Sequence, residues 1–268
     1  MDNPSDQQVA IVGCGLAGCG VVTILKESFA QDPRAPAYLI AVDDNGETLN
    51  AALADKKVLA RGGEKPEMDL DLGGFPVVFF VLEPSETSAL IFARALASRA
   101  SAQRAYTFGF LVKPSGGWPE EDKKVYASFD GSALVDEGWV LKARKGNDPE
   151  YAMRIAFNFT AHALAFMAEA VGDGKLGRDA LWSATYGKVA GFAATSLSQP
   201  ETLFNMTMSN IDNTQVKSVI LFMPEDTDNM AARRIFLFVS NHLPRSIEMI
   251  ALRVKKVEPF RIVALLAS

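Results

Sequence analysis

The sequence predicts an α/β fold in which a doubly wound, mostly parallel sheet is followed by a long central helix and a smaller α+β domain. Apolar runs of strand length alternate with helical patterns through the first half of the chain, which is typical of a parallel sheet with helices on both faces. The helical pattern at 149–171 is apolar nearly all round, as in a helix buried at the centre of a protein. Beyond it, polar and apolar residues alternate at 248–254, which indicates a sheet with one exposed face.

In the first half, the expected strands and helices follow one another with short connections. The strands are expected at 9–12, 37–42, 58–60, 77–82 and 106–112, and the helices at 16–29, 47–54 and 88–100. The run at 77–82 is continuously apolar, as expected of a strand that is covered on both faces. We therefore assign residues 1–148 to one doubly wound domain.

The second half begins with the central helix, which we take as a separate unit at 149–174. Pro149 suits the first turn of this helix. Residues 175–268 form the predicted C-terminal domain, with strands expected at 187–195, 216–223, 246–254 and 259–266 and a helix at 229–241. The pattern is weak at 115–148, where one strand is expected at 139–142.

Composition is that of an ordinary globular protein. Of the 268 residues, 49% are hydrophobic and 22% are charged, and the net charge is −5. Because the balance is acidic and no Lys/Arg-rich run occurs, we expect no nucleic-acid partner. No uninterrupted apolar run reaches the roughly 18 residues of a membrane span, and the polar, acidic N-terminus does not have the pattern of a secretory signal.

The chain has two cysteines, Cys14 and Cys19, and both lie in a glycine-rich segment. They cannot build a disulfide framework or a zinc site, and His162 and His242 are too few for a metal cluster, so we expect no metal. A thiol at a helix N-terminus can be reactive, but we prefer the interpretation of small buried residues that allow close packing. Sparse cysteine usage fits a reducing, cytoplasmic environment.

The glycine-rich segment is the most informative motif of the chain. The strand at 9–12 runs into Gly13, Gly15 and Gly18, which satisfy G-x-G-x-x-G, and a helical pattern follows. A strand that turns at glycines into a helix presents N–H groups and the positive end of the helix dipole, which bind nucleotide phosphates. One hypothesis is a Rossmann NAD-dependent oxidoreductase with Asp43 as the ribose-binding acid, although no His–Asp or Tyr–Lys pair for hydride transfer stands out.

The order of the motifs resembles that of the tubulin/FtsZ superfamily, and the chain resembles a divergent FtsZ-like protein over nearly its whole length except 115–148. Residues 11–22 look like the first phosphate-and-base loop of FtsZ, and 40–50 and 108–114 resemble the next two conserved strands with their loops. The segments at 217–221 and 261–267 resemble the opening and closing strands of the family's C-terminal domain. The resemblance implies a nucleotide pocket, retained or vestigial, formed by Gly13, Cys14, Gly15, Gly18, Cys19, Asp43 and Asn158.

The second phosphate loop of the family, Gly-Gly-Gly-Thr-Gly-Thr-Gly, has no counterpart here. Residues 83–88 contain no glycine, and Pro84 has no N–H to donate. Glu83 and Glu86 put negative charge where phosphates would bind, and two like unit charges about 4 Å apart repel by roughly 4 kcal/mol at an effective dielectric constant of 20. This segment suits a helix N-terminus instead, with Ser85 or Thr87 as the expected cap. We therefore expect no resident cofactor, and any binding of GTP or GDP is expected to be weak.

Two further family features are altered. The loop that follows the central helix carries catalytic acids in the family, whereas in 174–182 the single acid is Asp179, which we expect to face solvent or to pair with a cation. Phe157 aligns with the family's base-reading Asn, and Asn158 lies one residue on, about 100° around the helix. The family's Asn in the first loop is replaced by Gly20, and His162 is expected to be a packed or hydrogen-bonded core residue.

These departures lead to one favoured hypothesis and two alternatives. The favoured hypothesis is an FtsZ-like protein that has no GTPase activity and no catalytic residues. It would act by self-association, or as a scaffold or regulatory partner of another FtsZ-like or cell-division-type protein. The first alternative is the NAD-dependent oxidoreductase. The second is an FtsZ-like GTPase whose phosphate loop is rebuilt from the hydroxyls of Ser85, Thr87 and Ser88. If no ligand remains at all, the fold serves as a structural module with an empty pocket.

Overall fold

The computed structural model describes residues 8–30, 37–61, 63, 66–113, 125–136, 149–195, 215–255 and 262–268. The helices and strands in this part of the chain are, in order, β1 (Val9–Cys14), α1 (Gly15–Phe29), β2 (Tyr38–Asp43), α2 (Gly46–Ala51), β3 (Lys56–Leu59), β4 (Val77–Leu82), α3 (Thr87–Ala102), β5 (Tyr106–Lys113), β6 (Gly131–Asp136), α5 (Pro149–Gly172), α6 (Arg178–Thr185), β7 (Val189–Thr195), β8 (Ser218–Pro224), α7 (Asn229–Asn241), β9 (Glu248–Val254) and β10 (Ile262–Ala267).

The described strands form one sheet in the order β3-β2-β1-β4-β5-β6-β7-β10-β8-β9. Strand β10 is antiparallel to its neighbours β7 and β8, and the other adjacent pairs are parallel. The first six strands follow the order of a doubly wound fold. The predicted fold class, a mostly parallel sheet with a long central helix, is confirmed.

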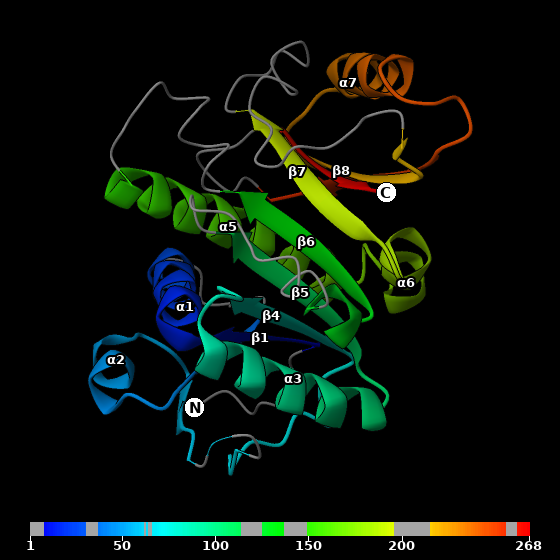
Figure 1. The fold of residues 1–268 in the computed structure, drawn as a ribbon. Helices are drawn as coiled ribbons and strands as arrows, with labels where there is room; N and C mark the ends of the chain where they lie inside the picture. The colour runs from blue at the N-terminus through cyan, green and yellow to red at the C-terminus, as the bar shows by residue number, and fades with distance from the viewer. Residues whose placement is uncertain are drawn as a thin grey trace.

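Helices cover both faces of the parallel part of the sheet (Figure 1). On β1, Val9 and Ile11 belong to a core that includes residues of α1 and α5. Ala10 and Val12 point to the opposite face and join a second core with residues of α3, because successive side chains of a strand alternate between faces. This double burial explains why the strands are apolar at every position.

Helix α5 crosses the middle of the molecule (Figure 1). Its stretch Met153–Gly172 has a mean hydropathy of 1.2, enough for a membrane span by length and composition, but 72% of this window is buried inside the fold. Phe159 packs against Phe192 of β7 with ring centroids 5.8 Å apart, and Phe166 packs against Phe222 of β8 at 6.2 Å. Core packing therefore accounts for the apolar composition that the sequence pattern assigns to a central helix.

The C-terminal strands carry their own core on the outer side, beneath α7. Ile235 and Val239 of α7 pack there with residues of β8 and β10. Asp228 begins the helix, because its carboxylate accepts a hydrogen bond from the Ala231 N–H at 2.8 Å. Strand β9 lies at the edge of the sheet and is mostly exposed or half-buried, in keeping with its alternating sequence.

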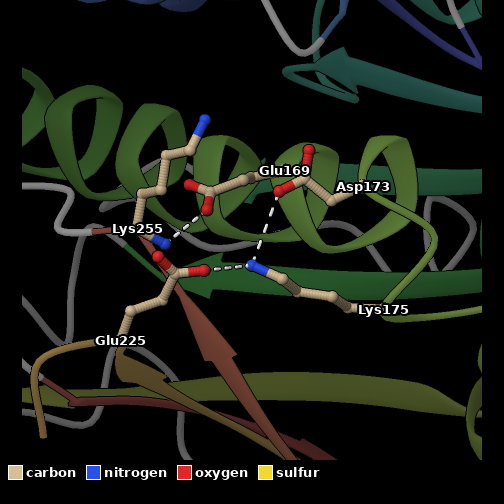
Figure 2. A network of polar contacts seen from close by, with 5 residues as sticks. All are labelled: Glu169, Asp173, Lys175, Glu225 and Lys255. Carbon is tan, nitrogen blue, oxygen red and sulfur yellow. Dashed lines mark hydrogen bonds and ion pairs between the residues drawn. The ribbon is translucent and has the colours of Figure 1, made fainter.

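A network of polar contacts joins the end of α5 to the ends of β8 and β9 (Figure 2). The buried carboxylate of Glu169 accepts a hydrogen bond from the Lys255 N–H directly after β9. The Lys175 ammonium lies 2.5 Å from a carboxylate oxygen of Glu225 and 3.4 Å from one of Asp173. These contacts position the central helix against the C-terminal strands.

Two elements differ from the sequence-based expectations. Strand β6 lies in the section 115–148, where the sequence pattern is weak. It begins with Gly131 and Ser132, which are not typical strand residues, so the sequence did not predict it. In the sheet it pairs with β5 on one edge and with β7 on the other. Helix α6 occupies the stretch that we expected to be a loop, and only Leu181, Ala184 and Thr185 of this helix are buried. The strand expected at 139–142 lies outside the described residues. Since β6 pairs with β7, the sheet runs on across the expected domain boundaries, and the three-part division stays a prediction.

Candidate functional site

Close packing of backbone explains two glycines of the G-x-G-x-x-G segment. A Cβ atom on Gly13 would lie 2.2 Å from the carbonyl oxygen of Gly18, and one on Gly18 would lie 2.4 Å from the carbonyl oxygen of Val81. Both distances are far below van der Waals contact. Gly13 and Gly18 therefore let α1 start directly against β1 and β4, which is a requirement of the fold with or without a ligand.

The third glycine lies beside a carboxylate. Gly15 has a φ of +72°, and a Cβ atom on it would lie 2.3 to 2.4 Å from the carboxyl atoms of Glu86. The Leu16 N–H donates to both carboxylate oxygens of Glu86 at 3.1 Å. Helix α1 has no acidic residue in its first turn, and Cys14 provides no side-chain cap. Glu86 thus supplies the negative charge that the start of a helix attracts.

Other carboxylates surround this contact. Burial raises the pKa of Glu86; the Leu16 N–H lowers it, and the charges of Asp43, Glu83 and Asp44 raise it again. Burial also raises the pKa of Asp43, which accepts a hydrogen bond from the Asn45 N–H at 2.8 Å. Four acidic side chains therefore gather near the carboxyl ends of β2 and β4, where a nucleotide's phosphates would require positive potential.

The two cysteines are buried parts of the same segment. Cys14 is fully buried, and this burial raises the pKa of its thiol well above the usual value. Burial likewise raises the pKa of Cys19 to about 12, and its Sγ lies 3.9 Å from the carbonyl oxygen of Val42. A thiol with a raised pKa is a poor nucleophile, so the interpretation of small buried residues fits and that of a reactive thiol does not.

On the side of the central helix, an aromatic ring lies against the glycine segment. A Cβ atom on Gly20 would lie 3.4 Å from the ring of Phe157. Asn158 is exposed, and its Nδ2 donates to the carbonyl oxygen of Arg154 one turn earlier at 2.8 Å. The structure brings together the predicted residues of 13–19 and Asp43, and the residue of α5 that it places beside the segment is Phe157.

The segment before α3 differs from our expectation in its capping. Glu86 occupies the N-cap position of α3 and makes no side-chain cap hydrogen bond there. The cap that we expected from Ser85 or Thr87 is therefore not present. The Ser85 hydroxyl instead donates to the carboxylate of Glu83. The prediction of a cap from Ser85 or Thr87 was wrong because the turn places Glu86 at the N-cap position of α3. The side chain of Glu86 contacts the start of α1 instead.

A cavity of about 560 Å³ adjoins the start of α3. Its polar lining comes from Asp44, Thr87 and Ser88, and its apolar lining includes Ile91 and Phe92. The hydroxyls of Thr87 and Ser88 are therefore available beside a hollow of ligand size, although Asp44 adds a negative charge to the same wall.

The other residues that the sequence singles out lie elsewhere. Asp179 is exposed in the first turn of α6, as we expected. His162 is half-buried on α5, and burial lowers its pKa, which fits a core histidine. Within the part of the chain that the structure describes, no group of three or more His, Cys, Asp or Glu side chains could hold a metal ion.

Sequence reasoning missed the contact between Glu86 and Leu16, which joins residues 70 positions apart. The sequence indicated that Glu83 and Glu86 lie near the expected phosphate site, but it did not show that Glu86 contacts the Leu16 N–H. Two features of the sequence could have indicated this contact. The first turn of α1 contains no acidic residue, and Glu86 lies in the segment where the family has a glycine-rich loop.

Comparison with known proteins identifies the fold. No protein-family model matches the sequence, and neither does any curated protein. Among solved structures, the FtsZ dimer from M. jannaschii matches with a TM-score of 0.79 at 15% identity, covering 98% of this chain and 88% of that one. CetZ2 from Haloferax volcanii, in a GTPγS-bound protofilament, matches at 0.71 with 15% identity, covering 97% and 92%. TubZ from Bacillus thuringiensis serovar israelensis, in GDP-form protofilaments, matches at 0.62 with 8% identity, covering 98% and 86%.

The chain therefore has the tubulin/FtsZ-superfamily fold, as its motifs predict. The low sequence identities agree with the predicted divergence. At such identities the likeness establishes the architecture, and the function has to be argued from the site.

Proposed function

We propose that this chain is an FtsZ-like protein with degenerate GTP-binding and catalytic loops, which acts by self-association or as a scaffold and not as a GTPase. The observation that carries the proposal is the Glu86 carboxylate on the Leu16 N–H at the start of α1. An internal anion at a helix N-terminus replaces the external anion that such a terminus otherwise binds.

Electrostatics support this exclusion of phosphate. A phosphate at the start of α1 would have to displace Glu86 and would then lie near Asp43, Asp44 and Glu83. Repulsion of roughly 4 kcal/mol for each like charge about 4 Å away corresponds to nearly three orders of magnitude in affinity. Glu86 is also tethered, so it competes at an effective concentration of about millimolar or higher.

The segment after the central helix supports the loss of catalysis. Asp179 is the single acid in 174–182, and it is exposed on α6. Self-association is supported by the fold, because the FtsZ, CetZ and TubZ structures that it resembles are a dimer and protofilaments. A protein that retains such contacts without a nucleotide would assemble constitutively.

Sedimentation velocity over a range of protein concentrations, with and without GTP and Mg²⁺, tests the proposal. We expect concentration-dependent oligomers with the same distribution in both conditions, and no phosphate release at any concentration. A chain that stays monomeric throughout would contradict self-association, and GTP turnover that rises with protein concentration would contradict the loss of GTPase activity.

The cavity beside α3 supports a second candidate function, an FtsZ-like GTPase with a rebuilt phosphate loop. Thr87 and Ser88 line that cavity, and hydroxyls can hold phosphate oxygens. This candidate predicts GTP turnover that falls in the double variant Thr87→Ala/Ser88→Ala. A parallel titration with NAD tests the oxidoreductase alternative, which predicts binding of NAD and not of GTP.

A further inference from the structure

Strand β9 gives the sheet a long edge. It is the last strand in the order of the sheet, so no strand in the described part of the chain pairs with its outer side. Such an edge presents backbone N–H and C=O groups to a further strand, and proteins usually protect it with lysines, proline or a short length. Strand β3, at the opposite edge, has four residues, two of which are Lys56 and Lys57. Strand β9 has seven residues with neither lysine nor proline, so it lacks these protections.

The hydrogen bonds between β9 and β8 show which backbone groups of β9 point outward. The Glu248 N–H donates to the Lys217 carbonyl at 3.1 Å, and the Val254 carbonyl accepts from the Glu225 N–H at 2.7 Å. The even-numbered residues of β9 therefore direct their backbone groups toward β8. Because the backbone groups of successive strand residues point to opposite sides, those of the odd-numbered residues point to the outer edge. We call these odd-numbered residues, Met249, Ala251 and Arg253, the outer residues.

The outer residues are self-complementary in an antiparallel arrangement about a two-fold axis. With Ala251 of each copy on the axis, the two Ala251 residues exchange N–H···O=C bonds, and Met249 exchanges them with Arg253 of the second copy. Each outward N–H and C=O of the outer residues thereby gains a partner. Ala251 is exposed, and its small side chain lets the two strands approach where the axis passes.

The face of β9 that is turned toward α5 would extend the apolar core. Ile250 and Leu252 are half-buried and pack against the core that includes residues of α5. In the same register, Ile250 lies opposite Leu252 of the second copy, in the closer, non-hydrogen-bonded type of pair. Apolar cross-strand pairs stabilise a sheet, so the pairing would cover side chains that one copy leaves partly exposed.

Charge favours the antiparallel direction. Glu248 lies at the start of β9, whereas Arg253 and Lys255 lie at its end. An antiparallel pair brings the acidic start of one strand beside the basic end of the other, and a parallel pair would bring like charges together. Because one strand carries both charges, the complementary partner is a second copy of this chain.

We propose that β9 pairs antiparallel with β9 of a second copy, in the register that places Ala251 on the two-fold axis. The contact uses the same surface of both copies, so it closes with two chains and joins their sheets into one. This inference rests on the proposed self-association and names the strand that would make it without a nucleotide.

Charges placed on the axis test the register. In Ala251→Lys or Ala251→Glu, like charges face each other across the axis, and we expect association to weaken at least about tenfold in sedimentation velocity. A mixture of the two variants brings opposite charges together and should associate more strongly than either variant alone. The matched controls are Ala102→Lys and Ala102→Glu, which change an exposed alanine at the end of α3 and should associate like the natural chain. Thermal unfolding monitors that each variant stays folded.

Disulfide cross-linking tests the same register by position. Residues directly opposite in a hydrogen-bonded pair have Cα atoms about 5.5 Å apart, which suits a disulfide. Oxidation should therefore link two copies of Ala251→Cys. Glu248→Cys is the control on the same strand, because residue 248 lies opposite Val254 of the second copy, and it should not cross-link. Cys14 and Cys19 are buried, which keeps them from competing.

The outcomes separate this inference from the proposed function. If the natural chain associates while the Ala251→Lys and Ala251→Glu variants associate equally well, this inference fails and the proposed self-association stands. The same holds if their mixture shows no recovery or if Ala251→Cys does not cross-link. A natural chain that is monomeric at every concentration contradicts both, and it would favour an extended peptide of another protein as the occupant of this edge.

Discussion

At the scale of the residue, the decisive feature is the carboxylate of Glu86. It lies on the Leu16 N–H, where the resemblance to FtsZ would place a phosphate oxygen. Burial raises its pKa, and the charges of the surrounding acids Asp43, Glu83 and Asp44 raise it further. The folded protein therefore stabilises the ionised form of Glu86 less well than water does, and the free energy of unfolding should depend on pH as a result.

Replacing Glu86 by Gln tests that electrostatic account. Because the pKa of Glu86 is raised in the folded protein above its ordinary value near 4.5, the folded chain binds this proton more tightly than the unfolded chain. The resulting stability is present below the ordinary pKa and is lost as the pH rises through the raised one. We expect the free energy of unfolding to fall less with rising pH in Glu86→Gln than in the natural chain, as measured by urea unfolding between pH 4 and pH 7.

The matched control for this measurement is Glu27→Gln, which neutralises an exposed carboxylate near the other end of α1. The control should follow the pH dependence of the natural chain. Equal slopes for Glu86→Gln and the natural chain would contradict the account.

At the scale of the element, the start of α1 depends on the absence of side chains. A Cβ atom on Gly18 would collide with the Val81 carbonyl oxygen at 2.4 Å, so Gly18→Ala should destabilise the fold by about 1–3 kcal/mol. Nothing lies within 4 Å of a Cβ atom on Gly46, the first residue of α2. Gly46→Ala should therefore leave stability unchanged or raise it by up to about 1 kcal/mol. Denaturant unfolding of both variants measures the difference, and similar effects would refute the packing explanation.

The network in Figure 2 makes a similar contrast between a buried and an exposed contact. Glu169 is 6% exposed and accepts the Lys255 N–H. Glu169→Ala leaves that N–H without its acceptor and should cost about 1–3 kcal/mol. Lys175→Ala removes a more exposed ion pair with Glu225 and should cost less than about 1 kcal/mol. Denaturant unfolding distinguishes the two, and a larger loss from Lys175→Ala would show that the ion pairs, and not the buried carboxylate, hold α5 to the sheet.

At the scale of the whole molecule, local patterns in the sequence were enough to predict the α/β class and the central helix. The strands β1 and β4 are apolar at every position because helices cover both of their faces, and that burial leaves a direct trace in composition. Strand β6 leaves a shorter trace, because only three consecutive residues of it, Ala133, Leu134 and Val135, are apolar, although Ala133 and Val135 are fully buried in the core.

The candidate site was only partly predictable. The glycines and Asp43 are visible as a motif, whereas the contact of Glu86 with Leu16 depends on how two distant loops meet. One residue of helical register decides whether Phe157 or Asn158 faces the glycine segment, and only the packing of α5 against α1 fixes that register.

The central claim is that Glu86 takes the place of a nucleotide's phosphate, and equilibrium binding of GTP to the nucleotide-stripped natural chain tests it most directly. We predict no saturable binding up to millimolar GTP in equilibrium dialysis with Mg²⁺ present. Saturable binding of GTP at micromolar concentration would contradict the account.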